Sequence, residues 1–414
     1  VASVPTRDQV RGLGLEPPNL PKKFAGPGAK WHFPPSLEIE PVHLELELDV
    51  DIPRATLLGS ATWKVVGRAA EARTLRLNAM DFQELKVTTG KGGDLTWSYD
   101  GNIVEIVWDA GFAAGEERTV TVTYKVVEPV AGLYFMSPIE QEPELSTYAA
   151  TDHETEKARY WLPCVDLPHV RTTLDMKISS DPAHTILANG AKKGEEMVGD
   201  DRKCAHWILQ QRCPSYLVCF AVGEFTRYDD GKFEDIPLSY FAGKDFTPED
   251  LKRTFGRTKP MLEWMTKKLG VPFPFPKYFQ FALPCFGGAM ENISLVSWSD
   301  GFVLNKKAEP ELVWLTDQVN VHEMAHSYFG DLVVCRDYAN AWLKESWATY
   351  IETCYLEDFK GEEEQLYDLY RNRKAYLTEA DDSYKRPIFN RYYRSSWQMY
   401  DRHLYPGGAC RMHT

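Results

Sequence analysis

Two histidines and a glutamate, His322, Glu323 and His326, form a His-Glu-x-x-His pattern inside a segment whose apolar spacing predicts a helix over about 310–329. Residues four apart on a helix project from the same face, so both imidazoles can reach one metal ion. Glu323 is rotated from that face by about a quarter turn. It can therefore stand beside the metal without binding it, where a general base for a water molecule must stand.

A catalytic zinc site needs three protein ligands and one open position. The third candidate is Glu345, on the next predicted helix at about 337–359, which follows a turn marked by Gly330-Asp331. The alternative interpretation is a solvated helix that carries two incidental histidines. We predict that the chain binds one Zn²⁺ through the two histidines and Glu345.

A second cluster, Gly288-Ala289-Met290-Glu291-Asn292, lies 30 residues before the first histidine and beside a predicted strand at about 293–297. A glycine lets a ligand approach the backbone closely, and a strand edge can pair with an extended peptide. A carboxylate at this position could accept the ammonium group of a peptide N-terminus. The alternative is an ordinary tight turn, for which Gly-Gly-Ala is equally suitable.

The zinc pattern resembles the signature of the gluzincin zinc aminopeptidases, the aminopeptidase N family. The 18-residue gap between the second histidine and the glutamate matches that signature, as do the flanking stretches 326–333 and 341–345. Lys344 and Ser346 replace the Asn and Gly that are common in the family. Neither position supplies a metal ligand, so we interpret both replacements as tuning of the site that leaves its ligands unchanged.

The pentapeptide resembles the Gly-Ala-Met-Glu-Asn exopeptidase motif of the same family, which implies that Glu291 holds the substrate α-amine. The stretch from Thr151 to Asp166 is similar to a second family segment, Thr-Gln-x-Glu … Ala-Arg … Pro-Cys-x-Asp. In that match Glu154 corresponds to a further amine-binding glutamate. Without the resemblance, Glu154 would be interpreted as a surface acid in a loop.

Asp152 stands where relatives have a Gln that lines the pocket for the first side chain of the substrate. A buried negative charge is costly unless it is paired. We therefore expect a cationic first side chain, Arg or Lys, to supply the partner. Gly287 stands where some relatives have a bulky Met, and it would leave room for this first side chain.

The stretch Tyr400-x-x-x-x-Tyr405-Pro406-Gly407-Gly408-Ala409 resembles the family pattern Tyr-x-x-x-x-Tyr-x-Lys-Gly-Ala. Tyr405 then matches the tyrosine whose O–H donates to the developing oxyanion. Gly407 replaces the usual Lys but does not alter the tyrosine. Without the resemblance, both tyrosines would be interpreted as core or turn residues.

The resemblance implies a zinc-dependent aminopeptidase that acts on peptides with a free N-terminus. When the amine is fixed a short distance from zinc, only the first peptide bond can reach the metal. Two alternatives stay open: a bifunctional aminopeptidase that also hydrolyses an epoxide, and a non-catalytic zinc-binding scaffold or truncated inactive fragment. Family members continue well beyond the Tyr405 segment, so we expect the catalytic domain to be truncated at its C-terminus.

The composition argues against some classes of function. The 414 residues include 47 basic and 60 acidic side chains, and a net charge of −13 disfavours general nucleic-acid binding, which needs a basic surface. No stretch approaches the roughly 18 apolar residues of a membrane span. The 8 cysteines form no Cys-x-x-Cys pair, so we expect free thiols and a cytoplasmic chain. The oligomeric state is not predicted.

The elements that must position these residues differ between the two parts of the chain. Apolar and polar residues alternate from His43 onwards, in short runs that recur to a predicted strand at 216–222. Helical spacing dominates after about residue 245. Thr247 is predicted to cap the first helix there, and Pro260 to interrupt or kink it.

We therefore predict an α+β fold in three parts. Residues 1–40, rich in Pro and Gly, are expected to form an extended lead-in, and residues 41–228 an antiparallel β domain. Residues 229–414 are expected to be mostly helical with a small sheet. The resemblance implies that the β domain is a β-saddle and that the helical part is a thermolysin-like zinc catalytic domain.

Overall fold

A computed structural model describes residues 23–90, 93–143 and 145–414 of the chain. These residues form two compact units. The larger unit is Pro34–Asp337, and the smaller unit combines the described residues up to Phe33 with Tyr338–Thr414. Residues 1–22 of the predicted lead-in lie outside the described residues. The predicted boundary between 228 and 229 falls within the larger unit, and the three-part division stays a prediction.

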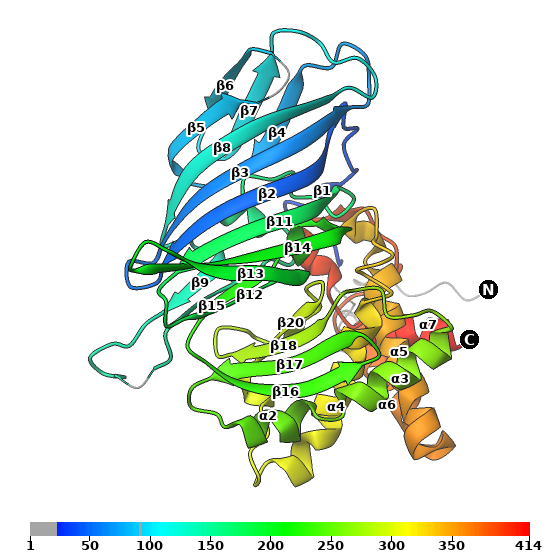
Figure 1. Cartoon of the computed structure of the whole chain (residues 1–414). Coiled ribbons are helices and arrows are strands. Elements are labelled where there is room, and N and C mark those ends of the chain that lie inside the picture. The colour runs from blue at the N-terminus through cyan, green and yellow to red at the C-terminus, as the bar shows by residue number, and fades with distance from the viewer. Residues whose placement is uncertain (1–22, 91–92, 144) are drawn as a thin grey trace, which may run out of the picture. The chain divides into compact units, whose positions relative to one another are not determined.

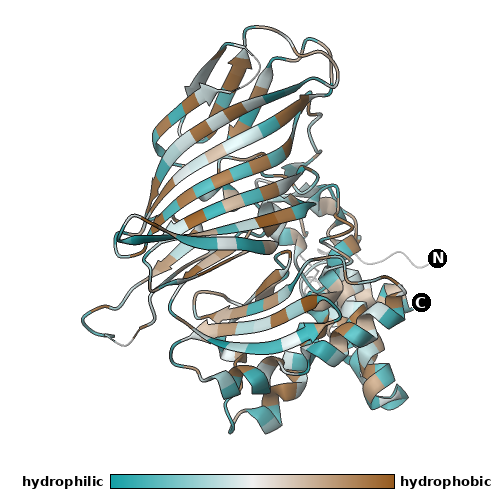
Figure 2. Ribbon diagram, in the orientation of Figure 1, coloured by the Kyte–Doolittle hydropathy of each residue, from teal (hydrophilic) through white to brown (hydrophobic). Residues whose placement is uncertain are grey.

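The largest sheet of the larger unit has seven strands in the order β13-β14-β11-β2-β3-β8-β5 (Figure 1). Alternation builds it: in β2, Leu44, Leu46 and Leu48 are buried, while Glu45 and Glu47 between them are exposed. Figure 2 shows hydrophobic and hydrophilic residues alternating along the strands of this sheet. All pairings are antiparallel except that of β11 with β2. The strands are β2 (Ile39–Asp51), β3 (Thr56–Gly67), β5 (Gln83–Thr89), β8 (Glu117–Val127), β11 (Arg171–Ser180), β13 (Ala191–Val198) and β14 (Arg202–Pro214).

Two smaller sheets complete the β-rich part of this unit. One has the order β4-β7-β6 and the other the order β12-β15-β10-β9. Their strands are β4 (Thr74–Asn78), β6 (Leu95–Tyr99), β7 (Ile103–Trp108), β9 (Gly132–Met136), β10 (Tyr148–Asp152), β12 (Thr185–Ala188) and β15 (Phe220–Gly223). The strand predicted at 216–222 is wrong in part, because Ser215–Leu217 forms a 3₁₀ turn before β15 begins.

A five-stranded mixed sheet, β16-β17-β18-β20-β19, follows in the same unit. Its strands are β16 (Phe225–Phe233), β17 (Ile236–Gly243), β18 (Tyr278–Leu283), β19 (Ala289–Met290) and β20 (Leu295–Ser299). The strand predicted from Ile293 begins two residues later, because Ser294 adopts a left-handed conformation with φ of 63°. The short edge strand β19 pairs antiparallel with β20 and carries part of the 288–292 pentapeptide.

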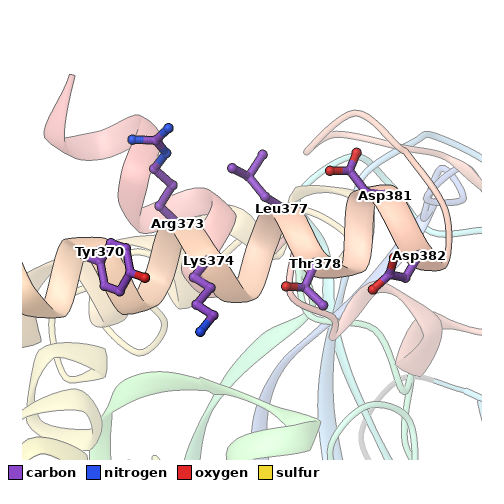
Figure 3. Close-up of a pocket in the computed structure, with 7 residues that line it drawn as sticks. All are labelled: Tyr370, Arg373, Lys374, Leu377, Thr378, Asp381 and Asp382. Atoms are coloured by element: carbon purple, nitrogen blue, oxygen red, sulfur yellow. The ribbon is translucent and has the colours of Figure 1, made fainter.

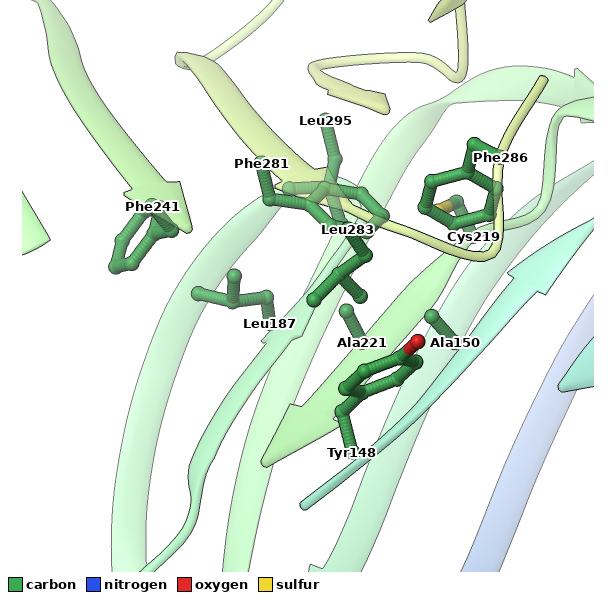
Figure 4. Packing of buried hydrophobic residues seen from close by; sticks show 10 residues of the cluster. All are labelled: Tyr148, Ala150, Leu187, Cys219, Ala221, Phe241, Phe281, Leu283, Phe286 and Leu295. Atoms are coloured by element: carbon green, nitrogen blue, oxygen red, sulfur yellow. The ribbon is translucent and has the colours of Figure 1, made fainter. Parts of the chain in front are cut away.

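A buried apolar cluster joins this sheet to the β12-β15-β10-β9 sheet (Figure 4). Burial of a Phe or Leu side chain contributes about 1.5–3 kcal/mol each, so the cluster fixes the strands that flank the pentapeptide. Its members are Tyr148, Ala150, Leu187, Cys219, Ala221, Phe241, Phe281, Leu283, Phe286 and Leu295.

The helices of the larger unit are α2 (Pro248–Phe255), α3 (Thr258–Leu269) and α4 (Glu309–His326). Thr247 caps α2 as predicted, in a reciprocal capping box with Asp250. The predicted interruption is also present: α2 ends at Phe255, and Pro260 lies in the first turn of α3, where its missing N–H costs nothing.

The smaller unit is helical. Its helices are α5 (Trp342–Lys360), α6 (Glu362–Asp382) and α7 (Pro406–His413), and β1 (Lys30–Trp31) pairs with β21 (Tyr392–Tyr393). The described chain also has short 3₁₀ helices in both units. Those of the larger unit are η1 (Ala158–Tyr160), η2 (Ser215–Leu217) and η3 (Asp300–Phe302), and those of the smaller unit are η4 (Tyr338–Asn340) and η5 (Ser396–Met399). The predicted α+β class is confirmed, with strands concentrated before residue 245 and helices after it.

Candidate functional site

His322 and His326 lie in the last two turns of α4, and their Nε2 atoms are 3.0 Å apart. Two nitrogens that each bind one tetrahedral zinc at about 2.0–2.1 Å lie about 3.3 Å apart, so the pair has the spacing of zinc ligands. The Nδ1 of His326 lies 2.9 Å from the backbone oxygen of Phe329. A carbonyl only accepts, so Nδ1 carries the proton and Nε2 presents its lone pair, as a zinc-binding imidazole must.

Two carboxylates lie beside this pair in the larger unit. Glu291 is only 3 % exposed, and its Oε1 is 3.9 Å from His326 Nδ1. A carboxylate oxygen of Glu154, which is also buried, lies within 4.8 Å of one of Glu291. Like charges this close in a buried place repel each other, and a cation between them relieves that repulsion. The geometry therefore suits an ammonium group next to the histidine pair.

The pentapeptide holds its shape through backbone and side-chain hydrogen bonds. Ser299 N–H donates to the Gly288 oxygen at 2.6 Å, and Asn292 Nδ2 donates to Ser297 Oγ at 3.1 Å. Ala289 and Met290 form β19 at the edge of the sheet. A Cβ added at Gly287 or Gly288 would meet no described heavy atom within 4 Å, so both glycines border open space rather than packed protein.

Asn189 was not predicted from the sequence, although it connects the Glu291 segment to the residues just before β15, the strand that pairs with β10. Its Nδ2 donates to the backbone oxygens of Leu217 at 3.0 Å and Ile293 at 2.7 Å, and its Oδ1 accepts from Cys219 N–H at 2.5 Å. Its sequence context, Asn189-Gly190, indicates only a turn. No local signal could have revealed partners that lie 28 and 104 residues away.

Asp152 is the last residue of β10, and Glu154 follows two residues later. Burial raises the pKa of the Asp152 carboxyl, the Lys157 ammonium opposes that rise, and the Glu291 charge adds to it. The Nζ of Lys157 lies 3.9 Å from Asp152 Oδ2. The premise that Asp152 needs a substrate cation is therefore weakened, because the chain already offers it one.

The remaining predicted site residues lie in the smaller unit. Glu345 is on the first turn of α5, is 2 % exposed, and accepts from the Nζ of Lys344 at 2.6 Å. Tyr405 immediately precedes α7, and its ring centroid lies 6.3 Å from that of Tyr400. Ser346 Oγ donates to the backbone oxygen of Leu404 at 2.8 Å, which ties the neighbour of Glu345 to the neighbour of Tyr405.

A second acidic cluster in the smaller unit, Glu379, Asp401 and His403, also has atoms within metal-binding distance of one another. Arg386 forms bidentate contacts with Asp401, at 2.7 and 2.5 Å, and Tyr384 donates to the same carboxylate. A guanidinium already balances this cluster, so we interpret it as a structural ion-pair network.

A surface hollow of about 440 Å³ lies along α6 (Figure 3). It is lined by side chains of both signs, including Arg373, Lys374 and Asp381, and by none of the predicted site residues. Charged groups of opposite sign on an exposed helix face are typical of a solvated surface. Among the described residues, no helix is both long enough and apolar enough to span a bilayer.

Comparison with known families gives matches over most of the chain. Residues 40–217 match the Peptidase M1 N-terminal domain, and residues 253–414 match the Peptidase family M1 domain. Aminopeptidase N of Lactobacillus delbrueckii subsp. lactis is 28% identical over 318 residues, which are 75% of this chain and 36% of the relative. Endoplasmic reticulum aminopeptidase 2 of Bos taurus is 25% identical over 428 residues, 98% of this chain and 44% of the relative. The chain thus spans about two fifths of the length of such curated relatives.

Solved structures show the same fold. The M1 zinc metallopeptidase of Deinococcus radiodurans superposes with a TM-score of 0.72 at 20% identity, covering 91% of this chain and 82% of that one. A variant of that protein bound to a Tyr-Ser-Ala substrate gives a TM-score of 0.71 at 20% identity, with the same coverage of both chains.

Proposed function

The chain belongs to peptidase family M1, with zinc aminopeptidases of the aminopeptidase N type as its relatives, and from this premise we propose that it removes N-terminal residues from peptides. The observation that carries the proposal is the pair of buried carboxylates, Glu154 and Glu291, within 4.8 Å of each other. Glu291 in turn lies 3.9 Å from one histidine of the zinc pair. A site for an amine next to a site for zinc is what an aminopeptidase needs.

His322 and His326 would hold the zinc, with Glu345 as the third ligand. The spacing of the two Nε2 atoms and the Nδ1–carbonyl contact of His326 support the first two assignments. The third rests on the family match and on the position of Glu345 in the signature. When bound, zinc polarises the scissile carbonyl and lowers the pKa of a water molecule towards about 7.

The other assignments give this chain's own side chains their roles. Glu323, buried one residue after the first histidine, would accept the proton of the attacking water and deliver it to the leaving amine. Tyr405 would donate its O–H to the developing oxyanion. Glu154 and Glu291 would bind the substrate ammonium, and Gly288, Ala289, Met290 and Asn292 would hold Glu291 and the backbone of the first residue.

Fixing the ammonium makes the reaction an exopeptidase reaction. The substrate amine cannot move far from the two glutamates without losing two charge-assisted hydrogen bonds, each of about 1.5–3 kcal/mol. Only the first peptide bond is then within reach of the zinc-binding histidines. A peptide whose N-terminus is blocked should therefore be a poor substrate.

The test is hydrolysis of aminoacyl fluorophores by the purified 414-residue chain, combined with a measurement of its zinc content. We expect one zinc per chain, loss of activity with a chelator and its return with Zn²⁺. N-acetylated fluorophores should not be cleaved. Glu323→Gln should keep the zinc and lose turnover by about 10²–10⁴-fold.

Each failure points to a different error. Substoichiometric zinc after native purification would favour the non-catalytic scaffold. Near-normal turnover in Glu323→Gln would refute the assignment of the base. Full zinc with no hydrolysis of any fluorophore would show that the chain binds metal but does not act as a peptidase in this form.

The cytoplasmic location expected from the sequence is also a proposal. It is supported by the cysteines, none of which forms a disulfide bond among the described residues. Fractionation of the producing cells tests it, and recovery of the chain outside the cytoplasmic fraction would contradict it.

A further inference from the structure

A hollow of about 320 Å³ in the larger unit lies between strands of the seven-stranded sheet, the β12-β15-β10-β9 sheet and the five-stranded sheet. None of the predicted site residues lines it. Its volume is in the range of small-molecule sites, which combine an apolar lining with a few convergent polar groups. We call it the Lys277 pocket, after the charged side chain that lies deepest.

Lys277 is unusual because it is only 2 % exposed. Its Nζ donates to the backbone oxygen of Ala188 at 2.7 Å and to Ser294 Oγ at 3.0 Å. An ammonium group has three donors, so these two bonds leave one. Among the described residues, no carboxylate forms an ion pair with it. Burial lowers the pKa of the Lys277 amine well below its usual range, because a buried ammonium group without a counter-ion is poorly stabilised.

Trp207 supplies a second donor. The side chain is 2 % exposed, and its Nε1 has no hydrogen-bond partner among the described residues. Buried indole N–H groups usually find a partner, because leaving one unpaired costs about 1–3 kcal/mol. The Nζ of Lys277 lies 4.9 Å from the centre of the Trp207 ring, and both residues line the hollow.

The rest of the lining is apolar or cationic. Leu187, Phe241 and Phe279 provide flat and branched apolar surface, and Lys277 Nζ lies 5.2 Å from the centre of the Phe279 ring. Lys192 and Arg227 also line the hollow, and no Asp or Glu is among its described lining residues. In a chain with a net charge of −13, such a set of side chains is complementary to an anion with an apolar body.

We propose that the Lys277 pocket binds a small carboxylate that carries an aromatic or branched apolar body, with the carboxylate accepting from Lys277 Nζ and Trp207 Nε1. The body would pack against Leu187, Phe241 and Phe279. The proposal does not rest on the peptidase reaction, because binding is measured directly.

The test is calorimetric titration of the zinc-loaded full chain with three probes of one shape: phenylacetate, 2-phenylacetamide and phenethylamine. We expect phenylacetate to bind at least about tenfold more tightly than the neutral amide, since a charge-assisted hydrogen bond contributes about 1.5–3 kcal/mol. Phenethylamine should show no binding, because its positive charge would be repelled by that of Lys277.

Variants assign the binding to the pocket. Trp207→Phe keeps a ring but removes the N–H, and it should weaken phenylacetate about fivefold to tenfold, whereas Trp97→Phe on exposed β6 should not. Lys277→Met should abolish the preference for the anion, with the exposed Lys232→Met as the matched control. If Lys277→Met does not fold, as judged by its thermal unfolding, Trp207→Phe alone decides.

A carboxylate could also bind zinc, so the titration is repeated with His322→Ala. Persistence of phenylacetate binding in that variant supports the proposal. Loss of binding in His322→Ala, equal affinity for phenylacetate and its amide, or an unchanged affinity in Trp207→Phe would each overturn it.

Discussion

Asn189 Nδ2 donates to the backbone oxygen of Ile293 at 2.7 Å, two residues after Glu291. The other end of the same amide accepts from Cys219 N–H, and Cys219 immediately precedes β15. Strand β15 pairs with β10, the strand that leads to Glu154. One buried side chain thus connects Ile293 to the strand pair that leads to Glu154, and we predict that it fixes the spacing of the two proposed amine-binding carboxylates.

Asn189→Asp tests this role because it keeps the acceptor but replaces the donor with an oxygen that faces two carbonyls. We expect KM for an aminoacyl fluorophore to rise about tenfold while kcat falls much less, since the amine site shifts and the zinc ligands do not. Asn102→Asp on an exposed turn is the control. A fall in kcat as large as the rise in KM, or an unchanged KM in a folded variant, would contradict a positioning role.

Glu291→Ala addresses the carboxylate itself. Loss of a charge-assisted hydrogen bond to the ammonium should raise KM by about 10- to 100-fold. It should also narrow the ratio of kcat/KM between a free and an N-acetylated substrate, because the free amine no longer contributes binding. Exposed Glu249→Ala is the matched control. An undiminished preference for the free amine would remove Glu291 from the amine site.

Asp152 and Lys157 should have opposite effects on the preference for a cationic first residue in the substrate. If the Asp152 charge attracts a cationic side chain, kcat/KM for Arg and Lys fluorophores should exceed that for Leu and Ala fluorophores by about twofold to fivefold. This is the effect expected of a partly exposed ion pair. Asp152→Gln should abolish that gain. Lys157→Gln should enlarge it, because the competing ammonium 3.9 Å away is removed. No gain in the parent chain, or an identical profile in all three proteins, would reject the preference.

The zinc helix and the pentapeptide could be predicted because their signals are local. The helix α4 follows from apolar spacing, and the four-residue step from His322 to His326 fixes a common face. Asn189 could not be found this way, since its role arises from partners that only the fold brings near. The same holds for Lys277, which in sequence is one lysine among 47 basic residues.

Helix α7 was also not predicted, because it contains two glycines. Each glycine in a helix costs about 1 kcal/mol relative to alanine, so Pro406-Gly407-Gly408 indicates a turn. In the fold those glycines are required by contact. A Cβ at Gly408 would collide with Ser346 Oγ, and one at Gly407 would lie 2.7 Å from the ring of Tyr376. Close packing against α5 and α6 therefore overrides the local propensity.

Gly408→Ala turns this contact into a test of the segment that carries Tyr405. The added methyl group should destabilise the chain by about 1–3 kcal/mol and lower kcat, because it pushes α7 away from Ser346. Ser346→Gly removes the colliding hydroxyl and should restore much of the lost stability in the double variant. Thermal unfolding and turnover of the two single variants and the double variant measure the coupling. Simple additivity would show that the two positions do not interact as described.

His153, between Asp152 and Glu154, makes acid stability the last prediction. It is fully buried and accepts from Trp161 Nε1 at 2.6 Å, and burial, aided by the Lys157 charge, lowers its pKa to about 3. Between pH 6.5 and 3 the unfolded chain binds a proton here that the folded chain does not. The free energy of unfolding should therefore fall as the pH decreases, by about 1.4 kcal/mol per pH unit from this residue.

His153→Gln keeps an acceptor for Trp161 but cannot titrate. Loss of zinc in acid affects parent and variant alike, so the difference between them isolates His153. Relative to the parent, the variant should gain about 2 kcal/mol of stability between pH 8 and pH 5 in urea unfolding. Parallel stability curves for the two proteins over that range would mean that His153 is protonated in the folded chain, and its buried contact with Trp161 would then need another explanation.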